Sequence, residues 1–315
     1  MSVSNIGGYP GSLIGLQEGQ PDIQPERQSE FEAGFDLSVL NGLLNFEFTY
    51  YKKNIYDFLM LSNPPSSSGF SSSWLNAGDL QNQGVELSLN ARPVSNRNIV
   101  WNTTFNFWLN RSLVTRFIIP PTPQGAFGYV LGSYQIQEGA SATQLLGLSP
   151  TGIVKWGDAE PIFQMNTYNE ITFQNKLSLR FLLHWKNGGQ NVNLTNLEND
   201  FGGTSADWDA QTIQKGVPNG AYRISQIGTS AQEFVQNSGY LKLREIGLYY
   251  SFSTSRNSFV KGLRVGISAS NFWVVTKYTS YDPEVSNFGT GFSSGVDVDP
   301  YPATKRADFH ISLDF

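Results

Sequence analysis

Polar and apolar residues alternate at every second position along much of this chain. Between 85 and 91 the odd-numbered residues are apolar and the even-numbered ones polar, and the stretch from Arg306 to Phe315 repeats the pattern. A period of two places neighbouring side chains on opposite faces of a β-strand. Each such segment is therefore predicted to be a strand with one apolar face and one polar face.

Nine segments are predicted to be strands on this basis. They are 29–38, 43–54, 80–91, 99–111, 162–173, 176–186, 239–252, 261–271 and 305–315. No segment of similar length places apolar residues at the 3.6-residue spacing of an amphipathic helix. Almost no helix is expected in the framework.

The connections between these strands alternate strictly between short and long. The short ones are 39–43, 92–98, 174–175 and 253–260. The long ones, rich in Gly, Ser, Asn and Pro, are 55–79, 112–161, 187–238 and 272–304. Compact soluble domains rarely contain loops of this length, whereas outer-membrane barrels combine short periplasmic turns with long extracellular loops. The predicted fold is all-β, an antiparallel transmembrane β-barrel, here a partial barrel of about nine strands.

The direction of the strands follows from this rhythm. If the short turns are periplasmic, the last strand ends at the periplasmic rim and residues 1–28 begin outside the cell. Bacterial barrels have an even number of strands, so nine strands that start outside do not close by themselves. We expect 1–28 to be the remnant of an extracellular loop and 29–315 to be the C-terminal strands of a larger barrel.

The amino-acid composition excludes few fold classes. Charged residues make up 15% and aromatic residues 14% of the chain, against about 25% charged in an average soluble domain. This suits a membrane barrel, but also a secreted β-sandwich. The absence of cysteine excludes disulfides and thiolate chemistry. The net charge of -5 argues against nucleic-acid binding, and the first residues do not have the pattern of a signal peptide.

Several short motifs occur in a characteristic order. They are Pro21-Asp22-Ile23-Gln24-Pro25-Glu26, Tyr50-Tyr51-Lys52-Lys53-Asn54, Asn82-Gln83-Gly84-Val85-Glu86, Gly157-Asp158-Ala159-Glu160-Pro161, Ser238-Gly239-Tyr240-Leu241-Lys242-Leu243-Arg244-Glu245-Ile246, Tyr281-Asp282-Pro283-Glu284 and Asp299-Pro300-Tyr301-Pro302. Together they resemble the SusC/RagA-like TonB-dependent transporters of the outer membrane, over nearly the whole chain.

That resemblance implies import of an oligosaccharide or a peptide across the outer membrane of a Gram-negative bacterium. It also implies a SusD-like surface lipoprotein as lid, the barrel-assembly machinery as a partner, and TonB as a partner of an N-terminal plug that is not visible here. Plugged transporters have roughly 22 strands, so about 13 would be absent and the chain is not expected to transport alone. The resemblance assigns the assembly signal to Phe309, Ile311, Leu313 and Phe315.

Aromatic residues of the loops are the candidates for contact with substrate or lid: Phe70, Trp74, Trp156, Trp208, Tyr281 and Tyr301. Packing of a loop against its neighbour is the alternative for each of them. A second aromatic set near strand ends is expected to anchor the barrel at the membrane interfaces: Tyr50, Tyr51, Trp101, Trp185, Tyr249, Tyr250 and Trp273.

The sequence gives little support for catalysis or for metal binding. His184 and His310 share predicted lumen faces with Ser178 and Ser312, but serine catalysis needs a base and an orienting group in contact, and polar residues are expected in a lumen anyway. Two acidic loop stretches, at 199–209 and 282–299, could hold calcium; solvated carboxylates are the expected alternative. No catalytic, metal or cofactor site is assigned. The competing functions are a self-contained passive porin or adhesin-like barrel and, third, an outer-membrane hydrolase.

Overall fold

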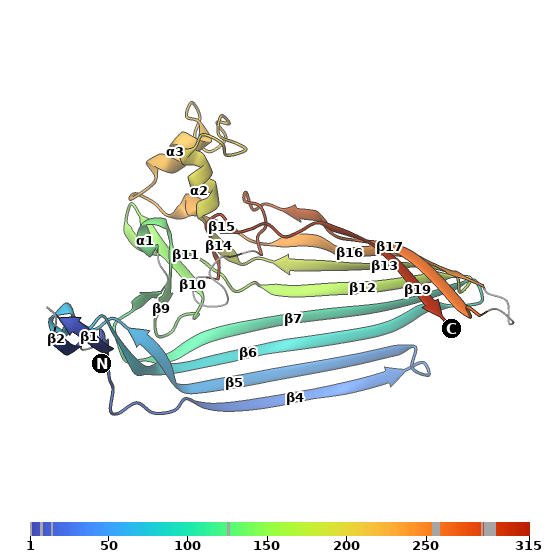
Figure 1. The fold of residues 1–315 in the computed structure, drawn as a ribbon, viewed down its shortest axis with the longest axis horizontal. Coiled ribbons are helices and arrows are strands. Elements are labelled where there is room, and N and C mark those ends of the chain that lie inside the picture. The colour runs from blue at the N-terminus through green and yellow to red at the C-terminus, as the bar shows by residue number, and fades with distance from the viewer. Residues whose placement is uncertain are drawn as a thin grey trace.

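The computed structural model describes residues 2–6, 9–13, 15–124, 127–253, 259–284, 286 and 294–315. Its framework is one antiparallel sheet in which nine long strands follow each other in sequence order (Figure 1). These strands are β4 (Arg27–Val39), β5 (Leu44–Ser62), β6 (Ser72–Ser95), β7 (Ile99–Phe117), β12 (Phe163–Phe173), β13 (Leu177–Asn187), β16 (Tyr240–Phe252), β17 (Gly262–Thr276) and β19 (Arg306–Asp314). The nine predicted strands and the all-β class are confirmed.

The strand register sorts side chains into an apolar and a polar face. One row of paired residues crosses eight strands: Phe35, Phe48, Leu87, Phe107, Met165, Trp185, Leu241 and Val275. The neighbouring row consists of Asp36, Glu47, Ser88, Asn106, Asn166, His184 and Lys242. The predicted two-faced strands are thus aligned into continuous bands, which we call the apolar face and the polar face.

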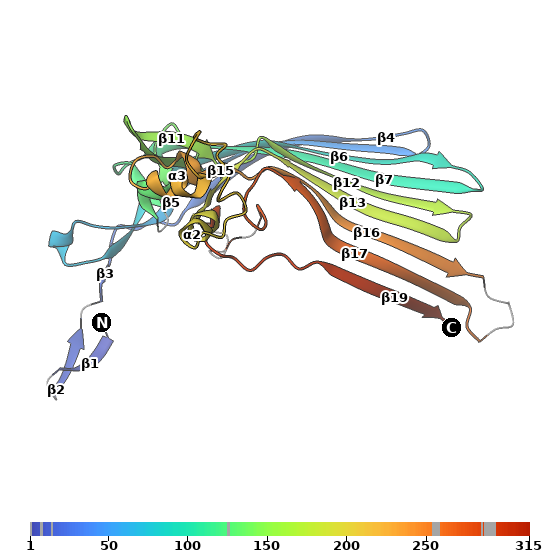
Figure 2. The same ribbon diagram turned by 90° about the horizontal axis from the view of Figure 1, so that it is seen from above.

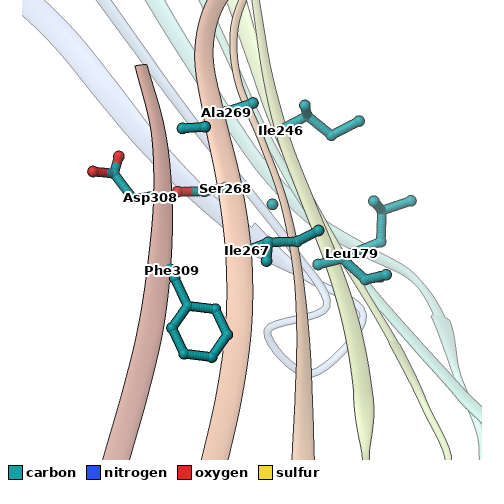
Figure 3. Close-up of a pocket in the computed structure, with 10 residues that line it drawn as sticks. Leu179, Ile246, Ile267, Ser268, Ala269, Asp308 and Phe309 are labelled. Atoms are coloured by element: carbon teal, nitrogen blue, oxygen red, sulfur yellow. The ribbon is translucent and has the colours of Figure 1, made fainter.

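The apolar face remains largely uncovered. Figure 3 shows the alternation on β19, where Asp308 and Phe309 project to opposite sides of the strand. Phe309 is 68% exposed, and Ile267 beside it on β17 is 59% exposed. A hollow of about 600 Å³ lies here between Leu179, Ile267 and Phe309. Exposed side chains of this kind are those that a membrane barrel presents to lipid.

All short turns lie at one end of the sheet, which we call the turn end, and all long connections lie at the other, the loop end (Figure 1). At the turn between β12 and β13, Gln174 and Asn175 both have positive φ angles, 48° and 54°. Two such residues form the hairpin turn whose twist matches that of antiparallel strands. Seen from above, the strands fan out and the sheet curves from β4 to β19 (Figure 2).

The long connections contain structure that periodicity did not predict. Segment 112–161 carries β8 (Thr122–Gln124), α1 (Gly128–Leu131), β9 (Ser133–Ile136), β10 (Gln144–Ser149) and β11 (Gly152–Asp158). Segment 187–238 carries β14 (Gln190–Asn193), α2 (Leu194–Phe201), α3 (Asn219–Ser225), η2 (Gln232–Phe234) and β15 (Val235–Asn237), and segment 272–304 carries β18 (Val296–Asp297). Before β4 lie β1 (Ser2–Ile6), β2 (Tyr9–Leu13) and β3 (Gln17–Glu18). No described helix has both the length and the apolar character needed to cross a membrane.

These loops share one hydrophobic core. Tyr134 and Leu145 from segment 112–161, which we call the first long loop, pack with residues of the other two segments. Val192 and Phe234 come from 187–238, the second long loop, and Val296 comes from 272–304, the third long loop. Each loop alone offers too few apolar side chains to form a core. The ordered conformation of each loop therefore depends on contacts with the other two. The result is a compact body at the loop end of the sheet (Figure 1).

Two expectations need correction. Segment 55–79 is mostly strand, because β5 and β6 stay paired as far as Ser62 and Ser73, past an irregularity at Asp57, whose φ is 56°. That irregularity breaks the period of two and hid the extension. Tyr51 and Tyr249 also lie on the polar face, since Tyr51 directly follows and Tyr249 directly precedes an outward-facing tyrosine, and neighbouring residues alternate in a strand.

Candidate functional site

Acidic residues of the third long loop are bound to the polar face near the loop end. Lys242 on β16 donates to Asp282 Oδ1 and to Glu284 Oε2, both at 2.5 Å. Arg244 Nη1 donates to Glu284 Oε2 at 2.6 Å, and Tyr240 also donates to Glu284. The Lys242 side chain is only 7% exposed. The two motifs around 240–244 and 281–284 therefore meet in space, and we call this group the β16 anchor.

Charge balance keeps the β16 anchor together. Burial by itself would raise the pKa of Glu284, but hydrogen bonds from Arg244, Lys242 and Tyr240 outweigh it and lower that pKa to about 2. His184 lies beside the anchor, where its Nδ1 accepts from Arg244 Nη2 at 2.6 Å. Because an arginine only donates, the neutral imidazole carries its proton on Nε2. His184 is thus a structural partner of Arg244.

A second acidic anchor joins the first long loop to β7. Glu160 accepts from the backbone N–H of Ser112 at 3.1 Å and from the side chain of Asn110. Asp158 accepts from the Thr143 hydroxyl at 2.6 Å. Burial raises the pKa of Glu160, although these hydrogen bonds oppose the rise. The motif at 157–161 therefore holds its loop against the polar face.

A third acidic anchor holds the segment that leads into β4 against β5. Glu26 accepts from the backbone N–H of Leu59, and Asn76 exchanges hydrogen bonds with the backbone of Gln24. Nearby, Arg116 bridges Asp57 and Asp79. Motif residues of 21–26 thus stabilise the part of β5 and β6 that departs from regular pairing.

Two cavities with polar groups in their walls lie between the loops and the polar face. One, of about 510 Å³, is lined by Asn82, Asn110, Ser112 and Glu160 among others. The other, of about 280 Å³, is lined by Gln164, Lys186, Asn191 and Glu284 among others. Tyr134 borders both. Amide, hydroxyl and carboxylate groups at such walls bind by hydrogen bonds rather than by covalent chemistry.

The six candidate aromatic residues fall into two groups. Trp156 donates its indole N–H to the carbonyl of Leu148, and the Trp208 ring lies against Gly220, so both pack within their loops. Phe70 is partly buried near the tip of the β5–β6 hairpin. Trp74, Tyr281 and Tyr301 are 42%, 57% and 90% exposed. Of the six candidates, these last three present open rings at the loop end.

The histidine and serine pairs of the sequence do not assemble as catalytic units. Ser178 forms its hydrogen bond with Thr172 and not with His184. His310 Nε2 lies 2.8 Å from Ser268 Oγ, a partner that sequence reasoning missed. The cross-strand register would have identified this contact, because it pairs His310 with Gly266, which is two residues from Ser268 on the same strand.

The acidic loop stretches are solvated only in part, since Asp209 is exposed but several of the other carboxylates are buried. Asp200 and Asp297 are fully buried. Asp200 pairs with Arg223, and Asp297 accepts from Thr195 and Tyr278. No group of three or more potential metal ligands occurs in the described part of the chain. These carboxylates join loop segments to one another.

The residues of the C-terminal segment lie in a row on the apolar face. Phe309, Ile311 and Leu313 are paired with Ile267, Val265 and Leu263 of β17. Phe315 follows the strand, is 65% exposed, and contacts the ring of Phe259. The segment forms the last edge of the sheet.

Known proteins resemble this chain in sequence and in fold. Residues 4–150 match the family model described as TonB dependent receptor-like, beta-barrel. The chain is 23% identical to TonB-dependent receptor P39 of Formosa agariphila, over 100% of this chain and 38% of that protein. It is 22% identical to TonB-dependent receptor SusC of Bacteroides thetaiotaomicron, over 93% and 32%.

Solved structures show the same fold. The structure of the RagAB peptide transporter matches with a TM-score of 0.78 at 21% identity, over 100% of this chain and 38% of that one. The structure of the RagAB peptide importer in the closed-closed state matches with a TM-score of 0.74. The chain spans about a third of the length of the curated relatives it matches. The chain is thus similar to the SusC- and RagA-like TonB-dependent receptors, and its open sheet of nine long strands matches part of their β-barrel.

Proposed function

We propose that the chain forms one part of the wall and extracellular mouth of an outer-membrane importer for oligosaccharides or peptides. The observation that carries this proposal is the set of acidic anchors that hold long loops over cavities on the polar face of the sheet. A wall of this kind binds polar solutes at the mouth of a lumen, while the apolar face contacts lipid. The family is in general not enzymatic and belongs to the bacterial outer membrane.

The division of the chain follows from this proposal. Residues 1–28 belong to an extracellular loop, and 29–315 provide barrel strands. The loop end is extracellular and the polar face lines the lumen. Phe309, Ile311, Leu313 and Phe315 present the C-terminal signal to the barrel-assembly machinery, which is supported by their exposed row on the last strand.

A SusD-like surface lipoprotein is the proposed lid. The RagAB structures describe a two-component peptide importer, and the loop body here offers open rings at Trp74, Tyr281 and Tyr301. Exposed aromatic side chains are enriched where proteins bind partners or sugars. These three residues are therefore proposed to contact the lid or the substrate, whereas Trp156 and Trp208 support the loops.

Coupled transport is proposed to need more than this chain. The outer membrane has no nucleotide supply of its own, so energy arrives mechanically from TonB through a plug. Reconstitution of the 315-residue chain alone into vesicles, followed by measurement of energy-dependent uptake of labelled oligosaccharides and peptides, tests this point. We expect none; any uptake would refute the proposal.

Insertion of the chain alone into a planar bilayer distinguishes the competing function. A self-contained passive porin would conduct ions across a planar bilayer without TonB or energy. The open edges of the sheet at β4 and β19 favour the importer part over this alternative. Steady single-channel conductance from the chain alone would favour the porin.

A further inference from the structure

Two arginines face a single tyrosine on the polar face near the turn end. The guanidinium carbon of Arg264 lies 4.7 Å from the centre of the Tyr249 ring, and that of Arg180 lies 5.1 Å from it. Such distances are those of cation–π contacts. The three residues come from β17, β13 and β16, and we call them the arginine–tyrosine cluster.

Backbone space for this arrangement is provided by glycine. Tyr249 is paired with Gly266 across the strands. A Cβ atom at Gly266 would lie 2.2 Å from the ring carbon Cδ1, and one at Gly247 would lie 2.8 Å from Cε2. Any larger residue at Gly266 would displace the ring. The flat position of Tyr249 against the wall is therefore built into the strand sequence.

The positive charge of the cluster is only partly balanced. Arg180 pairs with Glu170 at 2.7 Å. Arg264 has no carboxylate within ion-pair distance among the described residues, and its buried Nε has no hydrogen-bond partner there. Asp314 lies on the same face of β19, beyond Ser312, without forming an ion pair in that described part. One guanidinium thus remains free to bind an anion.

A hollow lies next to this free guanidinium. It has a volume of about 410 Å³ and is lined by Tyr249, Arg264, His310 and Ser312 among others. Arg264 and Ser312 are paired opposite each other. Guanidinium and hydroxyl groups can both donate hydrogen bonds into this space. The planar donor fork of arginine matches the two oxygens of a carboxylate or phosphate.

We propose that the arginine–tyrosine cluster binds an oxyanion, a carboxylate or phosphate group, on the lumen wall near the turn end. The anion has two sources: a solute in the lumen, or an acidic side chain of a polypeptide segment that lies there. Tyr249 fixes the two guanidinium planes, and Arg264 and Ser312 provide the donors. The site rests on the assignment of the polar face to the lumen, which the proposed function shares, but it does not require transport.

Chemical modification of arginine tests this site. The protein is extracted from its outer membrane in detergent, and the rate at which phenylglyoxal modifies Arg264 is measured by peptide mass spectrometry. Acetate, inorganic phosphate and chloride are compared at equal ionic strength, so that screening is constant. Arg97, exposed in the turn between β6 and β7, is the internal control at the same end of the sheet.

For a solute site, acetate or phosphate at about ten times its Kd slows modification of Arg264 about tenfold, and leaves Arg97 unchanged. For an acidic side chain already bound there, Arg264 reacts slowly without added anion, and reacts faster in a separate series in which the chloride concentration is raised. Either result supports the proposal. It is overturned if Arg264 responds like Arg97, or if it reacts slowly in every solution.

A pair of variants separates the site from general packing. Tyr249→Phe keeps the ring and is expected to keep the protection of Arg264. Tyr249→Leu removes the stacking surface and is expected to abolish it. Full protection in the Leu variant would overturn the role given to the ring. A failure of uptake by the importer would leave all of these results unchanged, so the two proposals fail separately.

Discussion

A carboxylate that is bound by cations stabilises the folded state only while it is ionised. Glu284 illustrates this, since Lys242, Arg244 and Tyr240 donate to it and lower its pKa from 4.5 to about 2. A group whose pKa falls on folding adds stability above its unfolded pKa, and the contribution disappears as the pH drops through the folded value. The contribution of Glu284 is therefore complete above about pH 4.5 and lost by about pH 2.

We predict that Glu284→Gln frees the third long loop at neutral pH. A charge-assisted hydrogen bond contributes about 2 kcal/mol, and its loss raises local opening roughly 30-fold. Hydrogen exchange, read by mass spectrometry on peptides covering 277–284, should increase by that factor. In wild-type protein, exchange of these peptides relative to the intrinsic amide rate should also increase as the pH is lowered from about 4.5 to about 2.

Glu245→Gln is the matched control for this residue. Glu245 is an exposed carboxylate on the same strand, with no ion pair among the described residues. Its replacement should leave exchange in 277–284 unchanged at neutral pH. Equal effects of the two variants would show that net charge, not the anchor, protects the loop.

At the scale of elements, the sequence predicts strands well and loops poorly. The strand cores follow a local signal, such as the strict alternation at 85–91, which needs no knowledge of distant residues. The loop body depends on contacts between segments, such as Val192 and Phe234 with Val296, that no local pattern reveals. The motif at 281–284 was visible, but its partners Lys242 and Arg244 emerge only from the fold.

The helical part of the second long loop should depend on one buried ion pair. Arg223 on α3 is 4% exposed and binds the fully buried Asp200 of α2 at 2.6 Å. Arg223→Met leaves that carboxylate without its cation, at a cost of about 3–5 kcal/mol. We expect hydrogen exchange to rise across 194–225 while the strands β12 and β13 stay protected.

Two further variants give this prediction its controls. Lys215→Met removes an exposed cation from the same loop and should change nothing. Combining Arg223→Met with Asp200→Leu removes both charges, and should restore most of the protection, since an apolar pair of similar volume can replace a buried ion pair. If the double variant is as labile as Arg223→Met alone, packing rather than charge holds α2 to α3.

At the scale of the whole molecule, the proposed assembly signal implies that recognition of the last strand precedes formation of the wall. We predict that Phe315→Ser lowers the amount of protein in the outer membrane several-fold, because the proposed assembly signal ends at this ring. Phe173→Ser is the control, since Phe173 is also exposed on the apolar face at the turn end. Immunoblots of purified outer membranes compare the two. Equal losses would mean that lipid contact, and not recognition of the C-terminus, explains the effect.

The open sheet also predicts that the nine strands of this chain do not close into a barrel by themselves. Within the described residues β4 and β19 form its two edges and do not pair, and each unpaired backbone group in lipid costs several kcal/mol. The chain contains no cysteine, so introduced pairs report directly on proximity. The chain produced alone should form a disulfide within one molecule between Ser88→Cys and Asn106→Cys, which lie opposite each other on β6 and β7. It should form none between Asp36→Cys and Ser312→Cys, on the two edges. A monomer cross-linked at that second pair would mean that the nine strands close by themselves, as a passive porin requires.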